Sequence, residues 1–337
     1  MPQEQEFAAA IRAAIARAIP GVTAIERLLR LSGGASQETW SLDALTEKGR
    51  IPLILRRRPQ GRADAGEGAT AVPLETEAEV IRRVAASGVP VPPVPYVCAV
   101  EDGIGSAFFM NRIEGETIAR KILRDERFAR VRPKLARQCG EILARIHRCE
   151  TAALPPLKVS AGPAQLATYK EIYERFDYPH PIFDLAIAWL KERLEDTPQP
   201  VLVHGDFRNG NLMIDESGIA AVLDWELTHL GDPREDLAWI CVNSWRFGMS
   251  ENRVGGFGHL EDLLQAYADA GGVHVTPEEI RVWEVLGSLK WGIMCMTMYG
   301  AFATGADRSI ERAAIGRRAS EAEIDLVNLL IPRRAAS

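Results

Sequence analysis

The order of apolar and polar positions divides the chain into a strand-rich first third and a helix-rich remainder. In the first third, short apolar runs bounded by Gly, Pro and Ser predict β-strands. In the remainder, apolar residues recur every three or four positions, which is the period of an amphipathic helix. Strands followed by helices indicate an α+β protein with two parts. We expect one lobe over residues 1–113 and a second over residues 114–337.

The first part begins with a predicted helix, in which Phe7, Ile11 and Ile15 recur at helical spacing. Small residues at 32–36 and at 61–70 predict loops. The strands expected here span residues 25–31, 38–42, 51–55, 96–100 and 107–113, with a helix at 74–84. A small sheet with two helices is therefore predicted.

The second part is predicted to be mainly helical. Leu135, Cys139 and Ile142 lie on one face of a long amphipathic segment. The helices expected from such spacing span residues 127–149, 182–194, 234–245, 260–270, 277–299 and 310–330, with one more around 169–176. Short apolar runs at 201–203, 212–214 and 220–223 predict three strands within this helical part.

Three polar residues lie beside these short strands. Asp206 follows the first strand, Asn211 precedes the second by one position, and Asp224 follows the third. Asn211 comes five residues after Asp206, and Asp224 comes thirteen residues after Asn211. A single Asp beside a strand is usually a turn or cap residue. Three polar residues in register between apolar runs favour a functional site on loops held by a rigid scaffold.

The first interval resembles the catalytic loop of protein kinases, H-R-D-x-x-x-x-N. Residues 204–211 read HGDFRNGN, and DWE at 224–226 takes the place of the metal-binding D-F-G element. With GDPREDLA at 231–238, the pattern resembles the aminoglycoside phosphotransferase and choline kinase-like family of small-molecule kinases. It is most similar to the branch associated with acyl-CoA dehydrogenases. The resemblance implies a bilobal protein-kinase-like fold, with ATP bound between a sheet lobe and a helical lobe.

The resemblance also implies a role for each polar residue between positions 201 and 239. Asp206 would be the catalytic base that takes the proton of the acceptor hydroxyl. Asn211 and Asp224 would hold one or two Mg²⁺ ions, which prefer oxygen ligands. Supporting positions are His204 and Asp236, which would brace the loop by hydrogen bonds, and Glu226, which would approach the second metal or the acceptor.

The first lobe would supply the groups that bind the nucleotide phosphates. Arg56 ends the 51–55 strand, where kinases carry a phosphate-pairing Lys. Arg presents a planar fork of donors that is always charged, whereas Lys is a compact point charge. The expected ion-pair partner of Arg56 is Glu77, with Glu75 and Glu79 as alternatives.

Two further segments would contact the nucleotide. Gly33, Gly34 and Ser36 belong to a small-residue turn whose backbone N–H groups would approach a phosphate. The alternative interpretation of this turn is a plain Gly-Gly hairpin. Met110 would lie behind the adenine at the hinge between the lobes, and backbone groups around Arg112 would pair with the edge of the base.

Composition narrows the class of protein. The formal net charge of −6 in 337 residues is not that of a nucleic-acid-binding protein. No apolar run approaches the ~20 residues that span a bilayer, so membrane insertion is not expected. The five cysteines are scattered without C-x-x-C spacing, which is typical of a reducing compartment. With no secretory signal pattern at its start, a cytoplasmic enzyme is expected. The oligomeric state stays open.

The expected partner is a small-molecule hydroxyl acceptor. A site for polycationic aminoglycosides would be lined with carboxylates, but residues 165–190 and 281–302, which should cover the acceptor, hold few acids. They hold Tyr169, Tyr173, Phe176, Tyr178, Trp283, Trp291, Met294, Met298 and Tyr299, with Lys170, His180 and Lys290 as polar exceptions. This composition favours a neutral or anionic acceptor, and the family branch implies a hydroxyacyl compound such as hydroxyacyl-CoA.

Other function classes were weighed against this hypothesis. A choline- or aminoglycoside-type kinase shares the same motifs. A nucleotide-binding pseudokinase would lack Asp206, Asn211 or Asp224, and all three are present, although Arg56 and the short Gly turn favour it. A metal-dependent hydrolase would carry a tighter motif such as H-E-x-x-H, which is absent. An acyl-CoA dehydrogenase activity has no support, because the chain has no Rossmann G-x-G-x-x-G.

Overall fold

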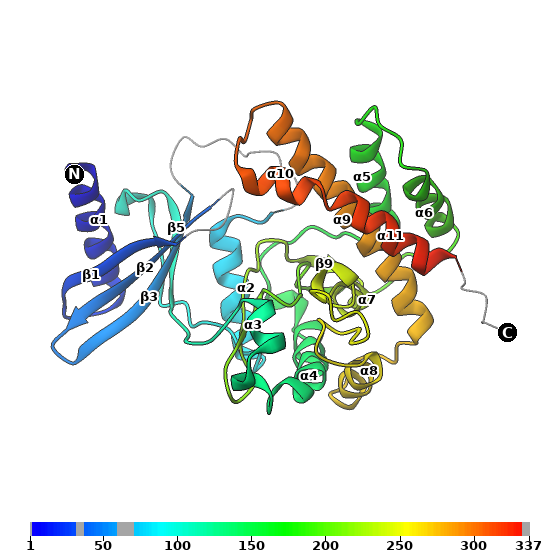
Figure 1. Cartoon of the computed structure of the whole chain (residues 1–337). Helices are drawn as coiled ribbons and strands as arrows, with labels where there is room; N and C mark the ends of the chain where they lie inside the picture. The colour runs from blue at the N-terminus through cyan, green and yellow to red at the C-terminus, as the bar shows by residue number, and fades with distance from the viewer. Residues whose placement is uncertain (1, 32–36, 59–70, 332–337) are drawn as a thin grey trace.

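The computed structural model describes residues 2–31, 37–58 and 71–331, and it has a sheet lobe followed by a helical lobe (Figure 1). The sheet lobe holds one five-stranded antiparallel sheet, in the order β1-β2-β3-β5-β4. Its strands are β1 (Val22–Leu31), β2 (Glu38–Thr46), β3 (Gly49–Arg58), β4 (Tyr96–Val97) and β5 (Ser106–Asn111). The predicted α+β, protein-kinase-like bilobal fold is confirmed.

Helices cover both faces of this sheet. Successive side chains of a strand point to opposite faces, and neighbouring residues of β5 show the result. Phe109 packs in a core with Ile11 and Ile15 of α1 (Pro2–Ala18), whereas Phe108 packs in a core with Leu74 of α2 (Leu74–Ala86). The second core continues into the helical lobe, so α2 joins the two lobes through apolar contacts.

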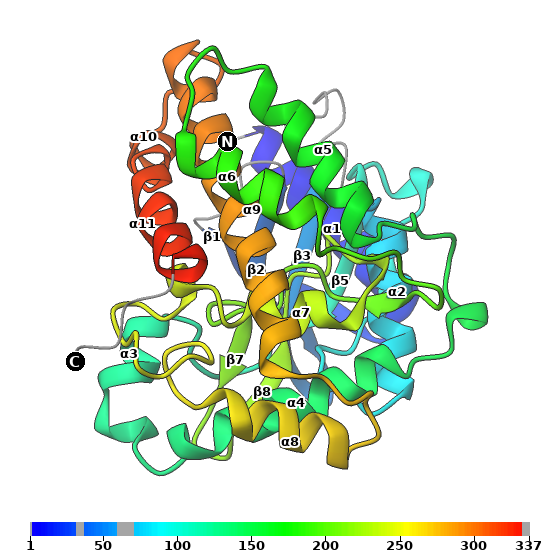
Figure 2. The ribbon, with the colours of Figure 1, turned by 90° about the vertical axis from the view of Figure 1, so that its right-hand side faces the viewer.

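The helical lobe is arranged around the long helix α9 (Pro277–Ala303), which passes through its middle in Figure 2. A capping box begins this helix, because Thr276 Oγ1 accepts from the Glu279 N–H and the Glu279 carboxylate accepts from the Thr276 N–H. The other helices are α3 (Ala119–Arg124), α4 (Leu135–His147), α5 (Gly162–Glu174), α6 (Pro181–Lys191), α7 (Pro233–Trp239), α8 (Leu260–Asp269), α10 (Ile310–Gly316) and α11 (Ala319–Leu330).

Two short strand pairs inside the helical lobe hold the polar loops. β6 (Val201–Val203) pairs with β9 (His229–Gly231), and β7 (Leu212–Ile214) pairs with β8 (Ile219–Val222), both antiparallel. The three strands predicted from the apolar runs are therefore present, and β9 was missed because its sequence, His-Leu-Gly, is not an apolar run. The β7–β8 pair places the start of β7 beside the end of β8, so that Asn211 and Asp224 lie at the same end of the hairpin. Along the chain, β5 is the last strand of the five-stranded sheet and α3 is the first helix of the helical lobe.

Several predicted elements are shorter than expected. The strand predicted at 96–100 ends at Val97 and is followed by a 3-10 turn at Val100–Asp102. The helix predicted at 127–149 begins only at Leu135, after two 3-10 turns, the second of which contains Pro133. The helix predicted at 310–330 is broken into α10 and α11, and that predicted at 234–245 ends at Trp239. Pro133 lacks the N–H that a continuous helix would need.

In the described part of the chain, no helix is both long enough and apolar enough to cross a membrane.

Candidate active site

The HGD segment leaves β6 through a turn that only glycine fits. Gly205 has φ +80°, in the left-handed region that favours glycine. A Cβ atom on Gly205 would lie 2.4 Å from the carbonyl oxygen of Leu227. The turn therefore brings the backbone of residues 204–206 close to the 224–228 loop, and it fixes the direction in which Asp206 leaves the strand.

A buried carboxylate holds this turn. Asp236 of α7 accepts from the N–H groups of His204 at 2.7 Å and Gly205 at 3.0 Å. Its Oδ2 also lies 3.2 Å from Nε2 of His147. Burial alone raises the pKa of Asp236, but the hydrogen bond and the charge of His147 outweigh burial, and the pKa is lowered. Asp236 thus supplies fixed acceptors for a loop backbone that has no strand partner.

The His204 ring ties the HGD turn to the strand that precedes Asp224. Its Nδ1 accepts from the Asp206 N–H at 3.1 Å, and its Nε2 lies 3.0 Å from the carbonyl oxygen of Leu223. A nitrogen that accepts carries no proton, so His204 is the tautomer that donates through Nε2. The ring is fully buried, which leaves it a structural part of the loop.

The Asp206 carboxylate accepts from three side chains. Asn211 Nδ2 lies 2.6 Å from Oδ2, and Trp239 Nε1 lies 2.7 Å from Oδ1. Arg208 Nε is shared between the two oxygens at 3.0 and 3.1 Å. Sequence reasoning did not find Arg208 or Trp239. Arg208 lies two positions after Asp206, which is a usable signal, but nothing in the sequence indicates that the last residue of α7 contacts this carboxylate.

The β7–β8 hairpin brings Asn211 and Asp224 together. Asn211 precedes β7, Asp224 lies two residues after β8, and the Leu223 N–H donates to the Asn211 carbonyl at 2.8 Å. Asp224 has φ +66°, a conformation that few non-glycine residues adopt and that Asp tolerates better than most. This backbone turn directs the Asp224 carboxylate toward the sheet lobe.

Arg56 reaches that carboxylate from β3 of the sheet lobe. Its Nη2 lies 3.0 Å from Asp224 Oδ1, its Nη1 lies 3.0 Å from Glu77 Oε1, and its Nη2 donates to Gln37 Oε1 at 2.8 Å. Glu226 is more distant, at 3.7 Å. Burial lowers the pKa of Arg56, but these carboxylates raise it by more than burial lowers it. The guanidinium therefore remains charged.

Of the three candidate partners on α2, Glu77 contacts Arg56. Glu77 is fully buried, whereas Glu79 pairs with Arg83 at 2.7 Å and Glu75 accepts from Ser106 at 2.6 Å. Burial raises the pKa of Glu77 to about 7, although the charge of Arg56 acts in the opposite direction.

Gln37, which follows the small-residue turn, completes the group of side chains around Arg56. Gln37 Nε2 donates to Glu226 Oε2 at 3.0 Å while its carbonyl oxygen accepts from Arg56. Gln37 was not expected from the sequence. The predicted phosphate-binding residues Gly33, Gly34 and Ser36 lie outside the described residues.

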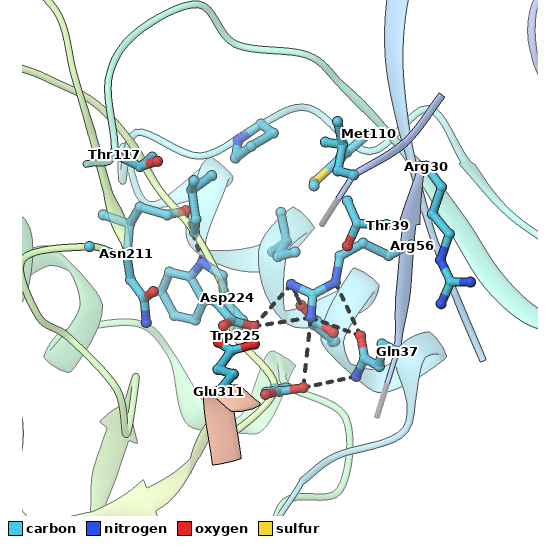
Figure 3. A pocket seen from close by; sticks show the side chains of 18 of the residues that line it. Arg30, Gln37, Thr39, Arg56, Met110, Thr117, Asn211, Asp224, Trp225 and Glu311 are labelled. Atoms are coloured by element: carbon cyan, nitrogen blue, oxygen red, sulfur yellow. Dashed lines mark hydrogen bonds and ion pairs between the residues drawn. The ribbon is translucent and has the colours of Figure 1, made fainter. Parts of the chain in front are cut away.

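A cavity of about 720 Å³ lies between the two lobes (Figure 3). Arg56 lies between Asp224 and Gln37 in this view, and Glu311 approaches from α10. The lining has a polar side, with Arg56, Glu77, Asn211, Asp224 and Glu226, and an apolar side, with Ile81, Pro92, Met110 and Val222. Asp206 is not a lining residue and joins the cavity through its hydrogen bond to Asn211. The structure therefore brings the predicted residues of both lobes to one cavity.

Arg112 points elsewhere. Its guanidinium pairs with Asp43 at 3.0 Å and donates to Ser41 at 2.9 Å, and its backbone N–H donates to Pro52. The N–H of Asn111 is also used, by the Pro93 carbonyl. Met110 lines the cavity, whereas the Arg112 side chain secures the end of β5 to the sheet.

The donors on the polar side fit a Mg²⁺ ion that arrives with a nucleotide. Among the described residues no group of three or more His, Cys, Asp or Glu side chains forms a metal site. Asn211 donates through its nitrogen to Asp206, which leaves its amide oxygen available, and Asp224 keeps one oxygen that Arg56 does not contact. Mg²⁺ is usually bound through one or two protein oxygens plus substrate phosphates and water, so this donor set is sufficient.

Comparison with known proteins places this cavity in a known class of enzyme. The model of the phosphotransferase enzyme family, APH, matches residues 27–283. The chain belongs to this family. The resemblance deduced from the HGDxxxxN and DWE motifs is confirmed, as is the expectation of an enzyme of the small-molecule kinase type. In this member of the APH family, Asn211 and the DWE residues 224–226 line the cavity between the lobes.

Solved structures share the whole fold of this APH-family chain. A Ralstonia eutropha protein assigned as an aminoglycoside phosphotransferase has a TM-score of 0.75 and 21% identity, covering 97% of this chain and 99% of its own. A choline/ethanolamine kinase family protein from Mesorhizobium loti has a TM-score of 0.61 and 21% identity, covering 96% of this chain and 95% of its own. At this identity the likeness establishes a common fold.

Curated relatives are longer than this chain. Acyl-CoA dehydrogenase family member 10 of Mus musculus is 29% identical over 226 residues, which are 64% of this chain and 20% of that protein. Acyl-CoA dehydrogenase family member 11 of Gallus gallus is 26% identical over 322 residues, which are 88% of this chain and 40% of that protein. The chain therefore spans two fifths or less of the length of these two relatives.

The buried carboxylate of Glu77 predicts a pH-dependent stability. Its pKa of about 7 in the folded protein exceeds the ordinary 4.5, so the folded state retains a proton that the unfolded chain has lost. This contribution to stability is fully present below the unfolded pKa and is lost as pH rises through the folded pKa. We expect the free energy of unfolding of the wild type to fall by about 2–3 kcal/mol relative to Glu77→Gln between pH 4.5 and pH 8.

Denaturant unfolding without nucleotide, at several pH values, measures this difference. Glu79→Gln is the matched control on the same helix, because the Glu79 carboxylate is partly exposed and pairs with Arg83 at the surface. A difference between wild type and Glu77→Gln that does not change with pH would contradict the expectation.

Proposed function

We propose that this chain transfers the γ-phosphate of ATP to a hydroxyl group of a small molecule, with Asp206 as the catalytic base. The observation that carries this proposal is the meeting of the two lobes at one cavity, where Arg56 and Glu77 of the first lobe face Asn211 and Asp224 of the second. Phosphoryl transfer requires mainly alignment and neutralisation of charge, and these side chains offer both.

Asp206 has the geometry of a base. A carboxylate has about four lone-pair sites, and three N–H groups, from Arg208, Asn211 and Trp239, already use it. Because Arg208 Nε contacts both oxygens, every lone-pair site already has a donor, and an acceptor hydroxyl would take the place of one of the two Arg208 contacts. In the transfer, the acceptor oxygen bonds to the γ-phosphorus, the bond from that phosphorus to the β–γ bridging oxygen breaks, and the hydroxyl proton passes to Asp206.

The nucleotide half of the cavity suits ATP. The apolar side around Met110 and Ile81 accepts a flat base, and Arg56 offers a fork of donors to phosphate oxygens. A spectinomycin phosphotransferase of the same fold, 13% identical with a TM-score of 0.61, is known in complex with ADP and spectinomycin. Asn211 and Asp224 would hold Mg²⁺, which supplies positive charge to the phosphates when it is bound.

We further propose a neutral or anionic acceptor, with a hydroxyacyl compound as the specific candidate. The names of the curated relatives point to acyl-CoA chemistry. Of the aromatic and Met residues expected on the acceptor side, only Met298 lines the cavity, and Tyr173, Trp283 and Trp291 are buried in the core. Ile315 adds a second apolar group from α10.

The charges that line the cavity are of both signs, with carboxylates in excess of arginines, so the lining alone does not select the acceptor. Asp307 and Glu311 line the cavity, but Arg312 lies beside Asp307 at 3.2 Å and offsets its charge. His180 pairs with Glu323 at 2.7 Å, and Lys170 pairs with Glu174. Lys290 has a longer carboxylate contact, 3.5 Å to Glu235 Oε1; burial lowers its pKa, but the charges of Tyr169, Glu235 and Asp206 raise it by more.

The first test concerns Arg56. Replacing it in Arg56→Met removes charge-assisted hydrogen bonds worth about 1.5–3 kcal/mol each, so ATP affinity and turnover should fall together by about tenfold or more. Arg57→Met is the matched control, because Arg57 pairs with Glu38 at 2.7 Å and lies over the Phe7 ring. Isothermal titration with Mg·ATP and the rate of ADP release measure both quantities. Equal behaviour of the two variants would refute the assignment of Arg56.

The second test concerns the base. Asp206→Asn keeps the size of the side chain and removes its ability to take a proton, so turnover should fall about 10²- to 10⁴-fold with Mg·ATP affinity nearly unchanged. Asp215→Asn, in the β7–β8 turn, is the control for a lost surface carboxylate. ADP release and nucleotide titration decide the matter. Loss of nucleotide binding in Asp206→Asn would count against a role in proton transfer.

The third test identifies the acceptor. ADP release should be measured with aminoglycosides, choline, homoserine, hydroxy acids and hydroxyacyl-CoA thioesters, each at several concentrations. We expect the highest kcat/KM with hydroxyacyl or other acidic acceptors, the class that the names of the curated relatives suggest. Efficient turnover of kanamycin-like compounds or choline, with none of acyl compounds, would overturn the acceptor class and leave the kinase proposal intact.

A further inference from the structure

Trp239 links the Asp206 carboxylate to a cation that no kinase motif contains. Its indole N–H donates to Asp206 Oδ1 at 2.7 Å, and the Lys290 ammonium lies 4.9 Å from the centroid of its ring. Trp239 is 4% exposed, so both contacts are inside the protein, where electrostatic attraction is stronger than in water. The ring of Trp245 packs against it at 5.4 Å.

Lys290 remains charged in this buried position. It lies in the middle of α9, 7% exposed, with Glu235 Oε1 at 3.5 Å and the Tyr169 ring at 5.7 Å. Burial lowers the pKa of Lys290, but Tyr169, Glu235 and Asp206 together raise it by more than burial lowers it. An ammonium with one long carboxylate contact and two aromatic faces has little other stabilisation, so its attraction to the Trp239 face is a substantial part of what holds it.

Glu235 is shared between Lys290 and a second partner, His229. Glu235 Oε2 lies 3.0 Å from His229 Nε2 and accepts from Gln165 Nε2 at 2.6 Å. The other ring nitrogen of His229 lies 2.9 Å from the Leu227 carbonyl, so both ring nitrogens face acceptors. Burial lowers the pKa of His229, but the charge and hydrogen bond of Glu235 act in the opposite direction, and the pKa is raised overall.

We propose that Trp239 and Lys290 are positioning residues for the base. Lys290 fixes the plane of the Trp239 ring, and the Trp239 N–H then holds Oδ1 of Asp206, so that the carboxylate keeps one orientation. This inference rests on the proposed role of Asp206. It goes beyond that role, because it assigns the orientation of the base to residues at the end of α7 and the middle of α9, outside the HGDxxxxN and DWE motifs.

The test uses water as the acceptor, since slow hydrolysis of Mg·ATP needs the same base and no identified substrate. Trp239→Phe keeps the ring and removes the donor. Its kcat for ADP release should fall about tenfold or more, the loss expected for a hydrogen bond to a charged group, while KM for ATP and Kd for Mg·ADP stay unchanged.

Trp291→Phe is the matched control. Trp291 is a buried core residue, and its indole N–H has no hydrogen-bond partner among the described residues, so the same substitution removes no bond. Its kcat should equal that of the wild type. Equal rates for the Trp239 and Trp291 variants would overturn the inference. A Trp239→Phe variant that loses Mg·ADP affinity as much as rate would also overturn it, because its effect would then be structural.

A second measurement addresses Lys290. In ¹H–¹⁵N spectra the Trp239 indole signal should lie downfield of the other tryptophans, because its N–H donates to a carboxylate, and Asp206→Asn should move it upfield. Lys290→Met should move the same signal and slow hydrolysis about three- to tenfold. An unmoved signal in Lys290→Met would overturn the part assigned to Lys290.

Asp206→Asn separates this inference from the proposed function. If Asp206→Asn hydrolyses Mg·ATP as fast as the wild type, the proposed base is wrong and the positioning roles fall with it. If Asp206→Asn is slow while Trp239→Phe is not, the base stands and only the further inference fails.

Discussion

A guanidinium inside a protein has to be surrounded by acceptors, because an unpaired buried charge costs several kcal/mol. Arg56 satisfies this condition only where the lobes meet. Glu77 is supplied by α2 of the sheet lobe, whereas Asp224 and Glu226 follow β8 of the helical lobe. The ion pairs of Arg56 therefore hold the two lobes in their relative placement. The cavity lies where these ion pairs form.

The same principle operates a second time in the helical lobe, with the signs reversed. Asp236 is a buried anion. Its carboxylate oxygens accept hydrogen bonds from backbone N–H groups of the HGD turn and contact His147. Burying it stabilises a backbone that no strand pairs. The Gly205 turn, which only glycine fits, then determines where Asp206 lies relative to Asn211. Two buried charges, one in each lobe, thus fix the Arg56 side of the cavity and the position of Asp206.

Much of this site could be predicted from sequence because its residues lie at fixed short distances along the chain. Asp206, Asn211 and Asp224 flank short strands, so their spacing survives folding with little change. Arg56 and Glu77 were found through the resemblance to kinases rather than through spacing. Arg208, Gln37 and Trp239 were missed.

Of the missed residues, Gln37 and Trp239 depend on packing between distant segments, whereas Arg208 lies only two positions after Asp206. Trp239 reaches Asp206 only because α7 packs beside β6, and Lys290 reaches Trp239 only because α9 packs beside α7. Apolar periodicity says which face of a helix is buried, and it contains no information on which neighbour that face meets. Helix ends failed for a local reason, as at Pro133, where 3-10 turns replace the first turns of the predicted helix.

The side chains around Arg56 come from both lobes, whereas those around Asp206 come from the helical lobe alone. The phosphate side needs both lobes, since Arg56 and Asp224 must meet across the cavity. The residues that hold the Asp206 carboxylate, namely Arg208, Asn211 and Trp239, all belong to the helical lobe. A change of acceptor through α5, α9 or α10 therefore leaves the Arg56 contacts intact. Under the proposed function, the acceptor side can change while the phosphate side is kept, because substitutions far apart with no shared partners act independently.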